Sequence, residues 1–321
     1  MTPFQLTKPI GIFYEHQQWF LLLFDKLNER GIPYVCIDAR SHSYDPRTIE
    51  DRYSLFFNRV SASAYLRGHG NAILYTLNYL AHLERLGTPV VNGHASFMIE
   101  TSKSLQLSLF ERLRLPYPRS RVTNSPKEVP NAAQDLRFPV LLKPNIGGRG
   151  AGIVRFDSAQ ALARAADTGL LDFGIDQTAL VQEYVPVRDG HIMRIEVLGR
   201  KFLYAIKVYT TGDNFNLCPA EFCHTEEGIA ALNEVCLVDA PKSGLQVEAF
   251  TPHQEVIQTV ERIAAAAGID VGGVECFVDD RDGTLMYYDI NALSNFVAEA
   301  ARVVGFDPYE RLADYLIRRA E

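Results

Sequence analysis

The first 95 residues alternate short apolar runs with longer amphipathic segments. The apolar runs, short enough to be strands, cover residues 9–13, 34–38, 55–60 and 89–92, and the helical segments between them cover 16–30 and 71–86. Strands separated by helices at this spacing predict a parallel, doubly wound sheet. Because Tyr14-Glu15-His16 follows the first strand in place of a glycine-rich turn, we do not expect a standard dinucleotide site.

Two further units are expected after this N-terminal unit at 1–95, and they cover residues 96–186 and 187–321. The middle unit shows helical patterns at 101–114 and 158–167 and strand patterns at 138–144, 153–156 and 179–185. The last unit shows a hairpin turning at Gly199-Arg200, a helix at 254–267, a second hairpin over 273–291 and a helix at 308–319. The chain is therefore expected to be α/β, with two α+β units after its doubly wound N-terminal sheet.

The second hairpin of the last unit carries candidate metal ligands. Asp289 and Asn291 are two residues apart in a strand, so both point to one face. A three-residue turn at 281–283, with Gly283 at positive φ, would place Glu275 opposite Asp289, whereas a four-residue turn would place Glu275 opposite Tyr288. Two carboxylates and an amide oxygen on one face predict a Mg²⁺ site. A solvated strand face is the alternative.

Composition and charge narrow the class of protein. Hydrophobic residues make up 47% and charged residues 22%, as in an ordinary soluble protein. The net charge of -7, without a long basic block, argues against nucleic acid as the main partner. Five scattered cysteines favour a reducing, cytoplasmic environment, with a weak zinc alternative at Cys218, Cys223 and His224. The apolar run at 19–24 is too short to span a bilayer, so no membrane association is expected.

Four glycines between two predicted strands form a second candidate site. Gly147, Gly148, Gly150 and Gly152 leave backbone N–H groups open to an anion, because no Cβ stands in the way. The segment lacks the Gly-Lys-Ser/Thr of a P-loop and is followed by a strand, so neither common glycine-rich nucleotide motif is present. We predict a flexible flap that closes over phosphates. A mobile hairpin tip without a ligand is the alternative.

Polar side chains flank this predicted flap. Lys143 ends an apolar strand four residues before the first glycine, where it can meet a phosphate as a point charge. Lys103 on the preceding helix can supply a second positive charge, although a lone surface lysine is the commoner case. Gln182-Glu183-Tyr184-Val185 offers backbone groups and a carboxylate to an adenine edge. An edge strand with one exposed acid is the alternative for that segment.

In their order along the chain, these motifs resemble the ATP-grasp superfamily. The likeness covers essentially the whole chain and is greatest to RimK-like carboxylate–amine ligases, the branch that includes ribosomal-protein glutamate ligases. Thr88-Pro89-Val90-Val91-Asn92-Gly93 and Ser102-Lys103-Ser104-Leu105-Gln106 match the start of that family's central domain. The resemblance implies an N-terminal parallel-sheet domain followed by two α+β subdomains that hold ATP between them.

The same resemblance implies roles for individual residues. Adenine would be held by Glu183 and the backbone of Val185, while Glu275, Asp289 and Asn291 would bind one or two Mg²⁺ or Mn²⁺ ions. Arg194 matches an arginine on the strand that enters the last domain, and Asn216 lies where the family has Asn-Leu near the γ-phosphate. The expected ATP contacts are Lys103, Lys143, Gly147, Gly148, Gly150, Gly152, Gln182, Glu183, Tyr184, Val185, Lys207 and Asn216. The expected catalytic residues are Arg194 and Lys143.

Several positions depart from the family pattern. Glu275 stands where the family usually has Asp and Asp289 where it has Glu, so one longer and one shorter side chain can preserve the metal position. Ile192 replaces a ribose-binding acid. Two further replacements lie in the segments Cys218-Pro219-Ala220-Glu221-Phe222 and Ala292-Leu293-Ser294-Asn295. These segments line the acceptor side in the family, so we expect a different acceptor here.

The expected chemistry is phosphoryl transfer from ATP to a carboxylate, followed by attack of an amine on the acylphosphate. Two lysines, backbone amides and Mg²⁺ suit the transfer, and Arg194 would stabilise the acylphosphate and the intermediate that follows. The expected partners are a small-molecule or peptide carboxylate and an amine or amino-acid acceptor, and a homo-oligomer is left open. A kinase on the same fold and a non-catalytic nucleotide-binding protein are the alternatives. The second is disfavoured, because a pure binder has little need for both lysines and three metal-ligand positions.

Overall fold

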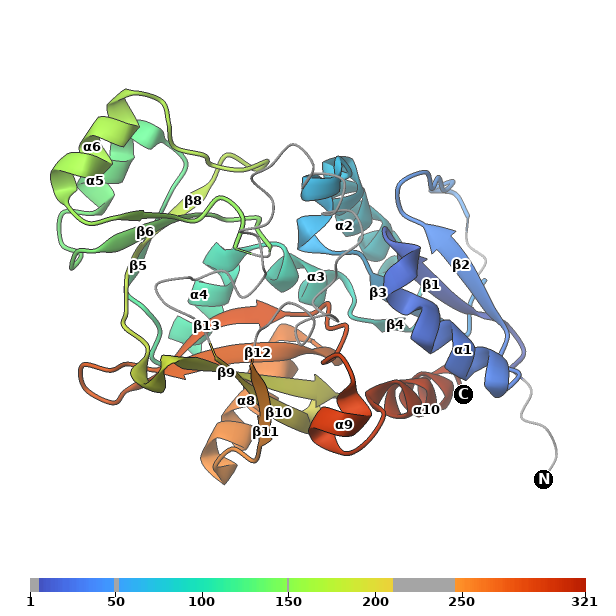
Figure 1. The fold of residues 1–321 in the computed structure, drawn as a ribbon. Coiled ribbons are helices and arrows are strands. Elements are labelled where there is room, and N and C mark those ends of the chain that lie inside the picture. The colour runs from blue at the N-terminus through green and yellow to red at the C-terminus, as the bar shows by residue number, and fades with distance from the viewer. Residues whose placement is uncertain (1–5, 49–51, 149, 210–245) are drawn as a thin grey trace, which may run out of the picture.

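The computed structural model describes residues 6–48, 52–148, 150–209 and 246–321, which form three sheets with helices around them (Figure 1). The central unit lies above the C-terminal sheet in that view, and the N-terminal unit lies beside both. The pattern of strands and helices confirms the α/β fold class expected from the sequence. Among the described residues, no helix has both the length and the apolar character needed to cross a membrane.

The N-terminal unit is a parallel sheet in the order β2-β1-β3-β4. Its strands are β1 (Ile10–Tyr14), β2 (Tyr34–Asp38), β3 (Leu55–Arg59) and β4 (Val90–Val91). Its helices are η1 (Gln17–Phe20), α1 (Leu21–Glu29), η2 (Ala62–Arg67) and α2 (Gly70–Arg85). Every residue of β1 and β3 is buried, as expected of the middle strands of a doubly wound sheet. The predicted strand–helix alternation is confirmed.

The central unit is an antiparallel sheet in the order β5-β8-β6-β7. Its strands are β5 (Ser120–Thr123), β6 (Val140–Pro144), β7 (Val154–Phe156) and β8 (Ala179–Glu183), and its helices are η3 (Pro126–Glu128), α5 (Val129–Ala132) and α6 (Ala159–Asp167). The Ser158 hydroxyl caps α6 by accepting a hydrogen bond from the N–H of Ala161. The glycine-rich segment joins β6 to β7, so it is a loop between antiparallel strands, as the sequence predicts.

The C-terminal sheet is antiparallel in the order β11-β10-β9-β12-β13. Its strands are β9 (His191–Leu198), β10 (Lys201–Tyr209), β11 (Val247–Phe250), β12 (Val271–Val278) and β13 (Leu285–Asn291), preceded by η4 (Arg188–Gly190). One face packs against α8 (Gln254–Ala267) and α4 (Lys103–Arg112), which follows α3 (His94–Glu100). Ile195 and Val274 belong to that apolar face, so their strand neighbours Arg194 and Glu275 point to the opposite face.

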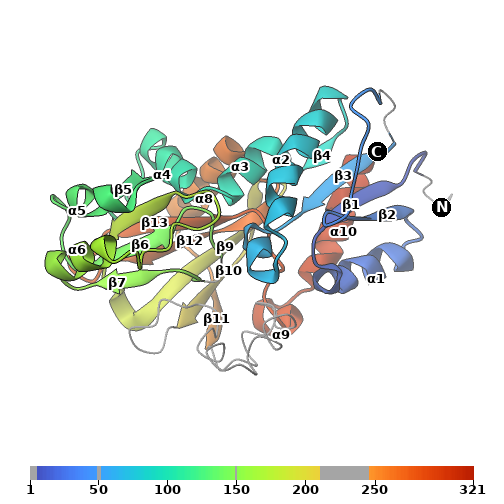
Figure 2. The ribbon, with the colours of Figure 1, turned by 90° about the horizontal axis from the view of Figure 1, so that it is seen from above.

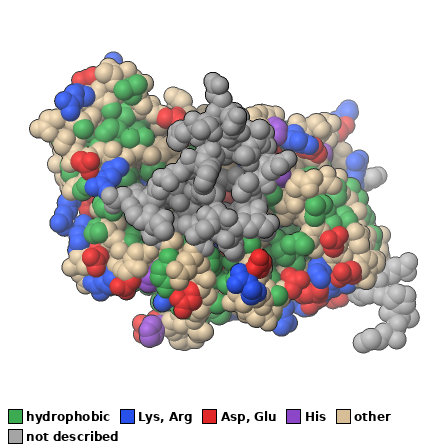
Figure 3. All heavy atoms as spheres, in the orientation of Figure 1, with side chains coloured by type: hydrophobic (Ala, Val, Ile, Leu, Met, Phe, Trp, Pro, Cys, Tyr) green, Lys and Arg blue, Asp and Glu red, His purple; other side chains and the backbone are tan. Residues whose placement is uncertain are grey.

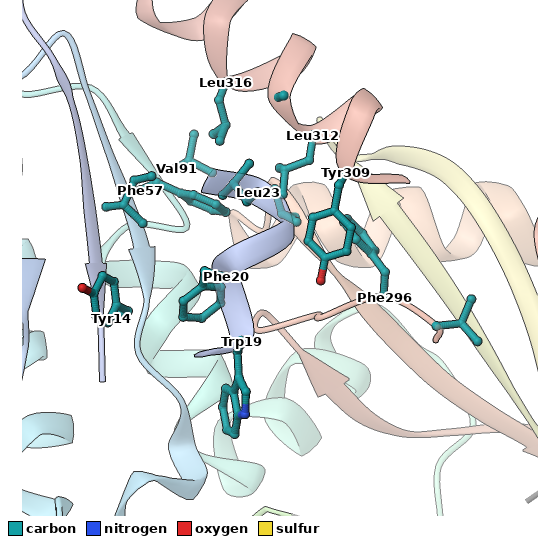
Figure 4. Packing of buried hydrophobic residues seen from close by; sticks show 14 of the residues in the cluster. Tyr14, Trp19, Phe20, Leu23, Phe57, Val91, Phe296, Tyr309, Leu312 and Leu316 are labelled. Carbon is teal, nitrogen blue, oxygen red and sulfur yellow. The ribbon is translucent and has the colours of Figure 1, made fainter. Parts of the chain in front are cut away.

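The C-terminal helices bring the end of the chain back to the N-terminal unit. They are α9 (Ala300–Val304) and α10 (Pro308–Ala320), and α10 lies beside α1 in both ribbon views (Figures 1 and 2). Leu312 and Leu316 of α10 pack in one buried cluster with Leu23 of α1 (Figure 4). That cluster also contains buried residues of β9, β10 and β12, so the N-terminal unit and the C-terminal sheet share a core. The central sheet has a cluster of its own, apart from Leu180 of β8, which packs with the C-terminal sheet.

Candidate functional site

One pocket lies where the three units meet, and most of the predicted site residues line it. Those residues are Lys103, Lys143, Gly147, Gly148, Gly150, Arg194, Glu275, Asp289 and Asn291. They come from α4, from β6 with its glycine loop, and from the polar face of the C-terminal sheet. Trp19 and Ser61–Ser63 of the N-terminal unit close another side of the pocket.

The register of the β12–β13 hairpin places Glu275 opposite Asp289, by a route that the sequence did not predict. The backbone N–H of Asp279 donates to the carbonyl of Thr284, so the turn has four residues, 280–283, with Gly283 at φ 83°. That turn length alone would set Glu275 opposite Tyr288. A bulge at Tyr288 shifts the pairing by one residue, which restores Glu275 opposite Asp289. Of the two turns left open by the sequence, the four-residue one is present, and the facing carboxylates are present as well.

Glu275 is buried in a network of hydrogen bonds. Its Oε1 accepts from Arg194 Nη1 at 2.8 Å and from Asn291 Nδ2 at 3.2 Å, and its Oε2 accepts from the Tyr288 hydroxyl at 2.5 Å. Burial raises the pKa of Glu275, and the nearby Asp289 carboxylate raises it further, against the opposing effect of Arg194. The site thus holds a concentrated negative charge that favours cations.

Asp289 is the second carboxylate of this face, and Lys103 neutralises it. Lys103 Nζ donates to Asp289 Oδ1 at 2.7 Å. Burial by itself would lower the pKa of Lys103, but the charge and hydrogen bond of Asp289 outweigh it and the net pKa is raised. Ser102 caps the helix that carries Lys103 by accepting from the N–H of Leu105. The first residue of α4 is therefore held firmly beside the acidic face.

The oxygen atoms on this face fit a hard divalent cation. Two carboxylates and the side-chain oxygen of Asn291 are the ligand types that Mg²⁺ prefers. Both carboxylates already draw a cationic group, Arg194 or Lys103, which shows that the face attracts positive charge. Within the described ranges, no group of three or more His, Cys, Asp or Glu residues is arranged around a common metal position. An amide oxygen would therefore complete the ligand set.

Arg194 has a second acidic partner, Glu196, that sequence reasoning missed. Arg194 Nε donates to Glu196 Oε1 at 2.6 Å, and the Glu196 side chain is almost wholly buried. Gly273 lies opposite on β12, where a Cβ would come within 3.0 Å of Glu196 Oε1 and 3.1 Å of Arg194 Nη2. The glycine therefore leaves room for the ion pair. The available signal was the two-residue spacing of Arg194 and Glu196, which places both on one face of a strand.

Lys143 lines the pocket from β6. Its Nζ donates to Gln182 Oε1 at 2.6 Å, and Gln182 in turn donates to the Ser120 hydroxyl. Burial lowers the pKa of Lys143 to about 8, and the positive charge of Lys103 adds to the decrease. Unlike the other two cations of the pocket, Lys143 has a neutral partner. An anionic ligand would therefore find it ready to form an ion pair.

The glycine loop approaches the N-terminal unit closely. A Cβ on Gly148 would lie 2.7 Å from the Cβ of Ser63 in η2, so a larger residue there would require a shift. Gly150 and Gly152 have positive φ, which disfavours other residue types. No described residue accepts a hydrogen bond from the N–H of Gly147 or Gly148. These amides are available to an anion in the pocket.

A comparison with models of protein families shows which family the region around the site resembles. The model for the RimK-like ATP-grasp domain matches residues 100–217, a region that contains both lysines, the glycine loop and Arg194. Over these residues the chain is similar to RimK-like ATP-grasp domains. Figure 3 shows one face of the molecule, and on its described part basic and acidic side chains are interspersed.

Curated relatives of this RimK-like protein share part of its sequence. A protein of Pseudomonas putida (strain GB-1) named probable alpha-L-glutamate ligase is 24% identical over 204 residues, which cover 63% of this chain and 59% of the relative. A protein of the same name from Saccharophagus degradans is 23% identical over 186 residues, covering 53% of this chain and 60% of the relative. The alignments therefore span less than two thirds of these relatives.

Solved structures match the RimK-like protein over nearly its full length. The ATP-grasp ligase PsnB, complexed with a minimal precursor, has a TM-score of 0.66 at 20% identity and covers 99% of this chain and 100% of its own. A RimK domain protein of Sphaerobacter thermophilus has a TM-score of 0.66 at 19% identity, covering 96% and 99%. The D-alanine–D-alanine ligase of Bacillus anthracis has a TM-score of 0.64 at 14% identity, covering 98% and 97%. These matches confirm the ATP-grasp fold.

Some residues expected to contact ATP lie elsewhere in this RimK-like protein. Gly152, Gln182, Glu183, Tyr184, Val185 and Lys207 do not line the pocket. Glu183 Oε1 accepts a hydrogen bond from the backbone N–H of Arg137, and Lys207 lies over the Phe250 ring. Lys207 pairs with Met193, the strand neighbour of Arg194, so it points to the sheet face opposite the pocket. Asn216 and the cysteine–histidine cluster at 218–224 lie outside the described residues.

Glu100 is a pocket residue that sequence reasoning did not find. It ends α3, a short helix whose N-terminal Gly93 has no side-chain cap, so no sequence signal marked it. Glu100 Oε2 accepts from the backbone N–H of Ala292 at 2.5 Å and of Leu293 at 3.4 Å. Burial raises the pKa of Glu100, and Asp289 raises it further. The residue thus anchors the segment that follows β13.

The exchange of backbone hydrogens gives a first test of the glycine loop. We expect amide exchange in residues 147–152 to slow when a nonhydrolysable ATP analogue binds, because free N–H groups gain phosphate partners. Hydrogen–deuterium exchange with mass spectrometry measures this directly. The turn at Gly199, outside the pocket, serves as the internal control. Exchange in the loop that ATP leaves unchanged would count against its role as a phosphate cradle.

Proposed function

We propose that this RimK-like protein is an ATP-dependent ligase that joins a carboxylate to an amine through an acylphosphate. The arrangement that carries the proposal is the single pocket in which Lys143 and the free amides of the glycine loop lie near the carboxylates Glu275 and Asp289. Lys143 and the loop amides suit phosphate, and the two carboxylates suit a metal ion that neutralises the charge of the phosphate. Sites of this composition serve phosphoryl transfer, where positioning and charge neutralisation supply most of the catalysis.

In the first step, a carboxylate oxygen attacks the γ-phosphorus of ATP, and the bond to the β–γ bridging oxygen breaks to release ADP. Lys143 and the loop amides hold the phosphates, with Lys103 as a second positive charge. Glu275, Asp289 and Asn291 would hold Mg²⁺, which supplies neutralisation of the charge on the phosphate oxygens. A PsnB structure contains Mg and ADP, which supports nucleotide and metal use on this fold.

In the second step, an amine nitrogen forms the C–N bond, and the acyl C–O bond to phosphate breaks. Starting from an ammonium group, two protons are lost, and both are accounted for if the phosphate leaves as H₂PO₄⁻. Arg194, held by Glu196 and Glu275, stabilises negative charge on the acylphosphate and on the tetrahedral intermediate. The chain's own residues therefore bind, orient and neutralise, and none needs to form a covalent bond with the substrate.

The proposed substrates are a small-molecule or peptide carboxylate and an amine or amino-acid acceptor. The names of the relatives point to glutamate, and one neighbouring structure holds a precursor peptide, so both small molecules and peptides are within the range of related proteins. We place the protein in a reducing, cytoplasmic environment, because Cys36 and Cys276 are free thiols.

An ADP-release screen over carboxylic acids, run with and without hydroxylamine, tests the proposed function. Formation of a hydroxamate together with ADP would demonstrate an acylphosphate, because hydroxylamine captures activated acyl groups. ADP formation with a stable phosphorylated product and no hydroxamate would instead identify a kinase. ATP binding without turnover on any acid would favour a non-catalytic nucleotide-binding protein.

A further inference from the structure

The charged side chains that line the pocket are not all paired with one another. The cations are Lys103, Lys143 and Arg194, and the anions are Glu100, Glu275 and Asp289. Two ion pairs, Lys103 with Asp289 and Arg194 with Glu275, use two of each. One cation, Lys143, and one anion, Glu100, form no direct ion pair among the described residues, although the positive charge of Lys103 acts on Glu100 and opposes the rise in its pKa. The proposed function gives Lys143 an anionic ligand, the phosphates, and leaves Glu100 unassigned.

Glu100 uses only one of its two oxygens for structure. Oε2 accepts from the N–H groups of Ala292 and Leu293, which hold the segment after β13 in place. No described residue donates a hydrogen bond to Oε1, although the side chain lines the pocket. An ionised carboxylate oxygen in this position is a free acceptor, and a cationic ligand would stabilise the charge that burial disfavours. Its natural ligand is a group that carries both N–H donors and a positive charge.

One wall of the same pocket is lined by neutral side chains, with two cations behind it: Arg67 lies over the Trp19 ring, and Arg59 donates a hydrogen bond to Asn295. It is formed by Trp19, Ser61, Ser63, Leu293 and Asn295, which offer an aromatic edge, hydroxyls, an apolar side chain and an amide. This wall belongs to the N-terminal unit and to the segment after β13, and its Ser63 lies against Gly148 of the glycine loop. A substrate with one positive end could place that end at Glu100 and lay its remaining atoms on the neutral wall.

We propose that Glu100 binds the amino group of the acceptor in its ammonium form, so the acceptor is a primary amine that approaches along the wall of Trp19, Ser61 and Leu293. This inference rests on the proposed ligase function and identifies the side of the pocket used in its second step. The proposal rests on matching charges: the phosphates bind Lys143, and the ammonium group binds Glu100. Because an ammonium nitrogen has no free electron pair, it gives one proton to a phosphoryl oxygen of the acylphosphate dianion before it attacks and the second proton afterwards, and both leave with H₂PO₄⁻.

The substitution Glu100→Gln changes the oxygen that faces the pocket and keeps the oxygen that holds the segment after β13. A glutamine carbonyl can still accept from the N–H of Ala292, while the group that faces the pocket becomes an uncharged N–H₂. With the acid found in the hydroxamate screen, ethylamine and hydroxylamine compete for the same acylphosphate. Ethylamine is protonated near neutral pH, whereas hydroxylamine is not. The ratio of ethylamide to hydroxamate therefore reports the attraction of the ammonium group, and any effect of the variant on acylphosphate formation cancels.

We expect Glu100→Gln to lower the ethylamide-to-hydroxamate ratio about 10- to 100-fold, as expected for loss of a hydrogen bond to a charged group. Glu84→Gln is the matched control, because Glu84 Oε1 accepts from the backbone N–H of His94 at the other end of α3, outside the pocket. That control should leave the ratio unchanged. An equal ratio in wild type and Glu100→Gln would overturn the proposal.

Thermal melting of Glu100→Gln and of wild type shows whether the substitution disturbs the fold. If it does, a second measurement on the wild-type protein tests the proposal. Trimethylamine, a protonated amine that cannot form a stable amide, should then inhibit ethylamide formation by the wild-type protein more strongly than hydroxamate formation. Equal inhibition of the two products would overturn the proposal. Absence of any hydroxamate from wild type would instead reject the ligase function, so the two failures are distinguishable.

Discussion

Replacing Asp289 by alanine is expected to abolish Mg²⁺-dependent ADP formation and to leave the fold intact. Loss of one of two facing carboxylates weakens metal binding and the neutralisation of phosphate charge, which together should slow turnover by at least about 10²- to 10³-fold. The fold should survive because the neighbouring Ile290 and Tyr287, on the other face of β13, supply its core contacts. Asn291→Ala should show the same loss for the same reason. Initial rates of ADP release against Mg²⁺ concentration, with thermal melting, measure both properties.

A matched acidic residue on the same hairpin controls for charge. Asp280 lies in the turn, is largely exposed and pairs with Arg188 outside the pocket. Asp280→Ala removes the same charge from the same element, and we expect it to keep the wild-type dependence on Mg²⁺. If Asp289→Ala or Asn291→Ala reached wild-type rates at saturating Mg²⁺, the substituted residue would have to be removed from the metal site.

Lys143→Ala is expected to weaken nucleotide binding or to slow transfer by about 2–3 kcal/mol, roughly 30- to 150-fold, the range of charge-assisted hydrogen bonds. Lys143 reaches the pocket from the end of β6 and has a neutral partner, Gln182, so it can turn to a phosphate without breaking an ion pair. Arginine should substitute poorly, because its planar fork does not fit a site built for a compact charge. Titration of an ATP analogue and single-turnover ADP formation measure the two effects.

The exposed Lys127, in η3 of the same unit, gives the control for Lys143. Lys127→Ala should change stability by no more than about 0.5 kcal/mol and should leave ATP affinity unchanged. Equal affinity together with equal turnover in Lys143→Ala and wild type would exclude Lys143 from the nucleotide site.

The depressed pKa of Lys143 gives this site a characteristic pH dependence. Without nucleotide its pKa is about 8, and a bound phosphate favours the charged form and raises that pKa. Below pH 8 the lysine is already protonated, so affinity should vary little. As the pH rises from about 8 to about 9, binding requires proton uptake and the affinity of wild type should fall. Lys143→Ala should lack this decline, so the ATP affinities of the variant and of wild type should become similar as the pH rises.

Local patterns in the sequence predicted most of the regular elements. The helix expected at 254–267 has the observed bounds of α8, because its apolar spacing is clear and Gly268 ends it at positive φ. The strand at 34–38 likewise matches β2. The short elements α3 and β11 were missed, since each is defined by contacts with distant parts of the chain and carries no strong local signal. The division of the chain at residues 96 and 187 stays a prediction.

Strand alternation made part of the candidate site predictable. The part that depends on contacts between distant segments of the chain could not be predicted. Alternation places Asp289 and Asn291 on one face, and the facing position of Glu275 follows from register. The bulge at Tyr288 could not be foreseen, because it is stabilised by a hydrogen bond to Glu275 that exists only in the folded hairpin. Glu100 joins the pocket through Ala292, far along the chain, so no local pattern indicates it.

The core shared by the N-terminal unit and the C-terminal sheet has a consequence for how the pocket can open. Since α10 packs both parts into one cluster and most of the central sheet's apolar side chains form another, we expect the central unit to move as a separate rigid body that pivots where Leu180 packs on the C-terminal sheet. Lys143 would travel with it, while Lys103, whose helix packs on the C-terminal sheet, would stay with the acidic face. Opening would thus separate the two lysines and lower the positive potential around the spent nucleotide. A single movement would then both uncover the product and weaken the electrostatic field that retains it.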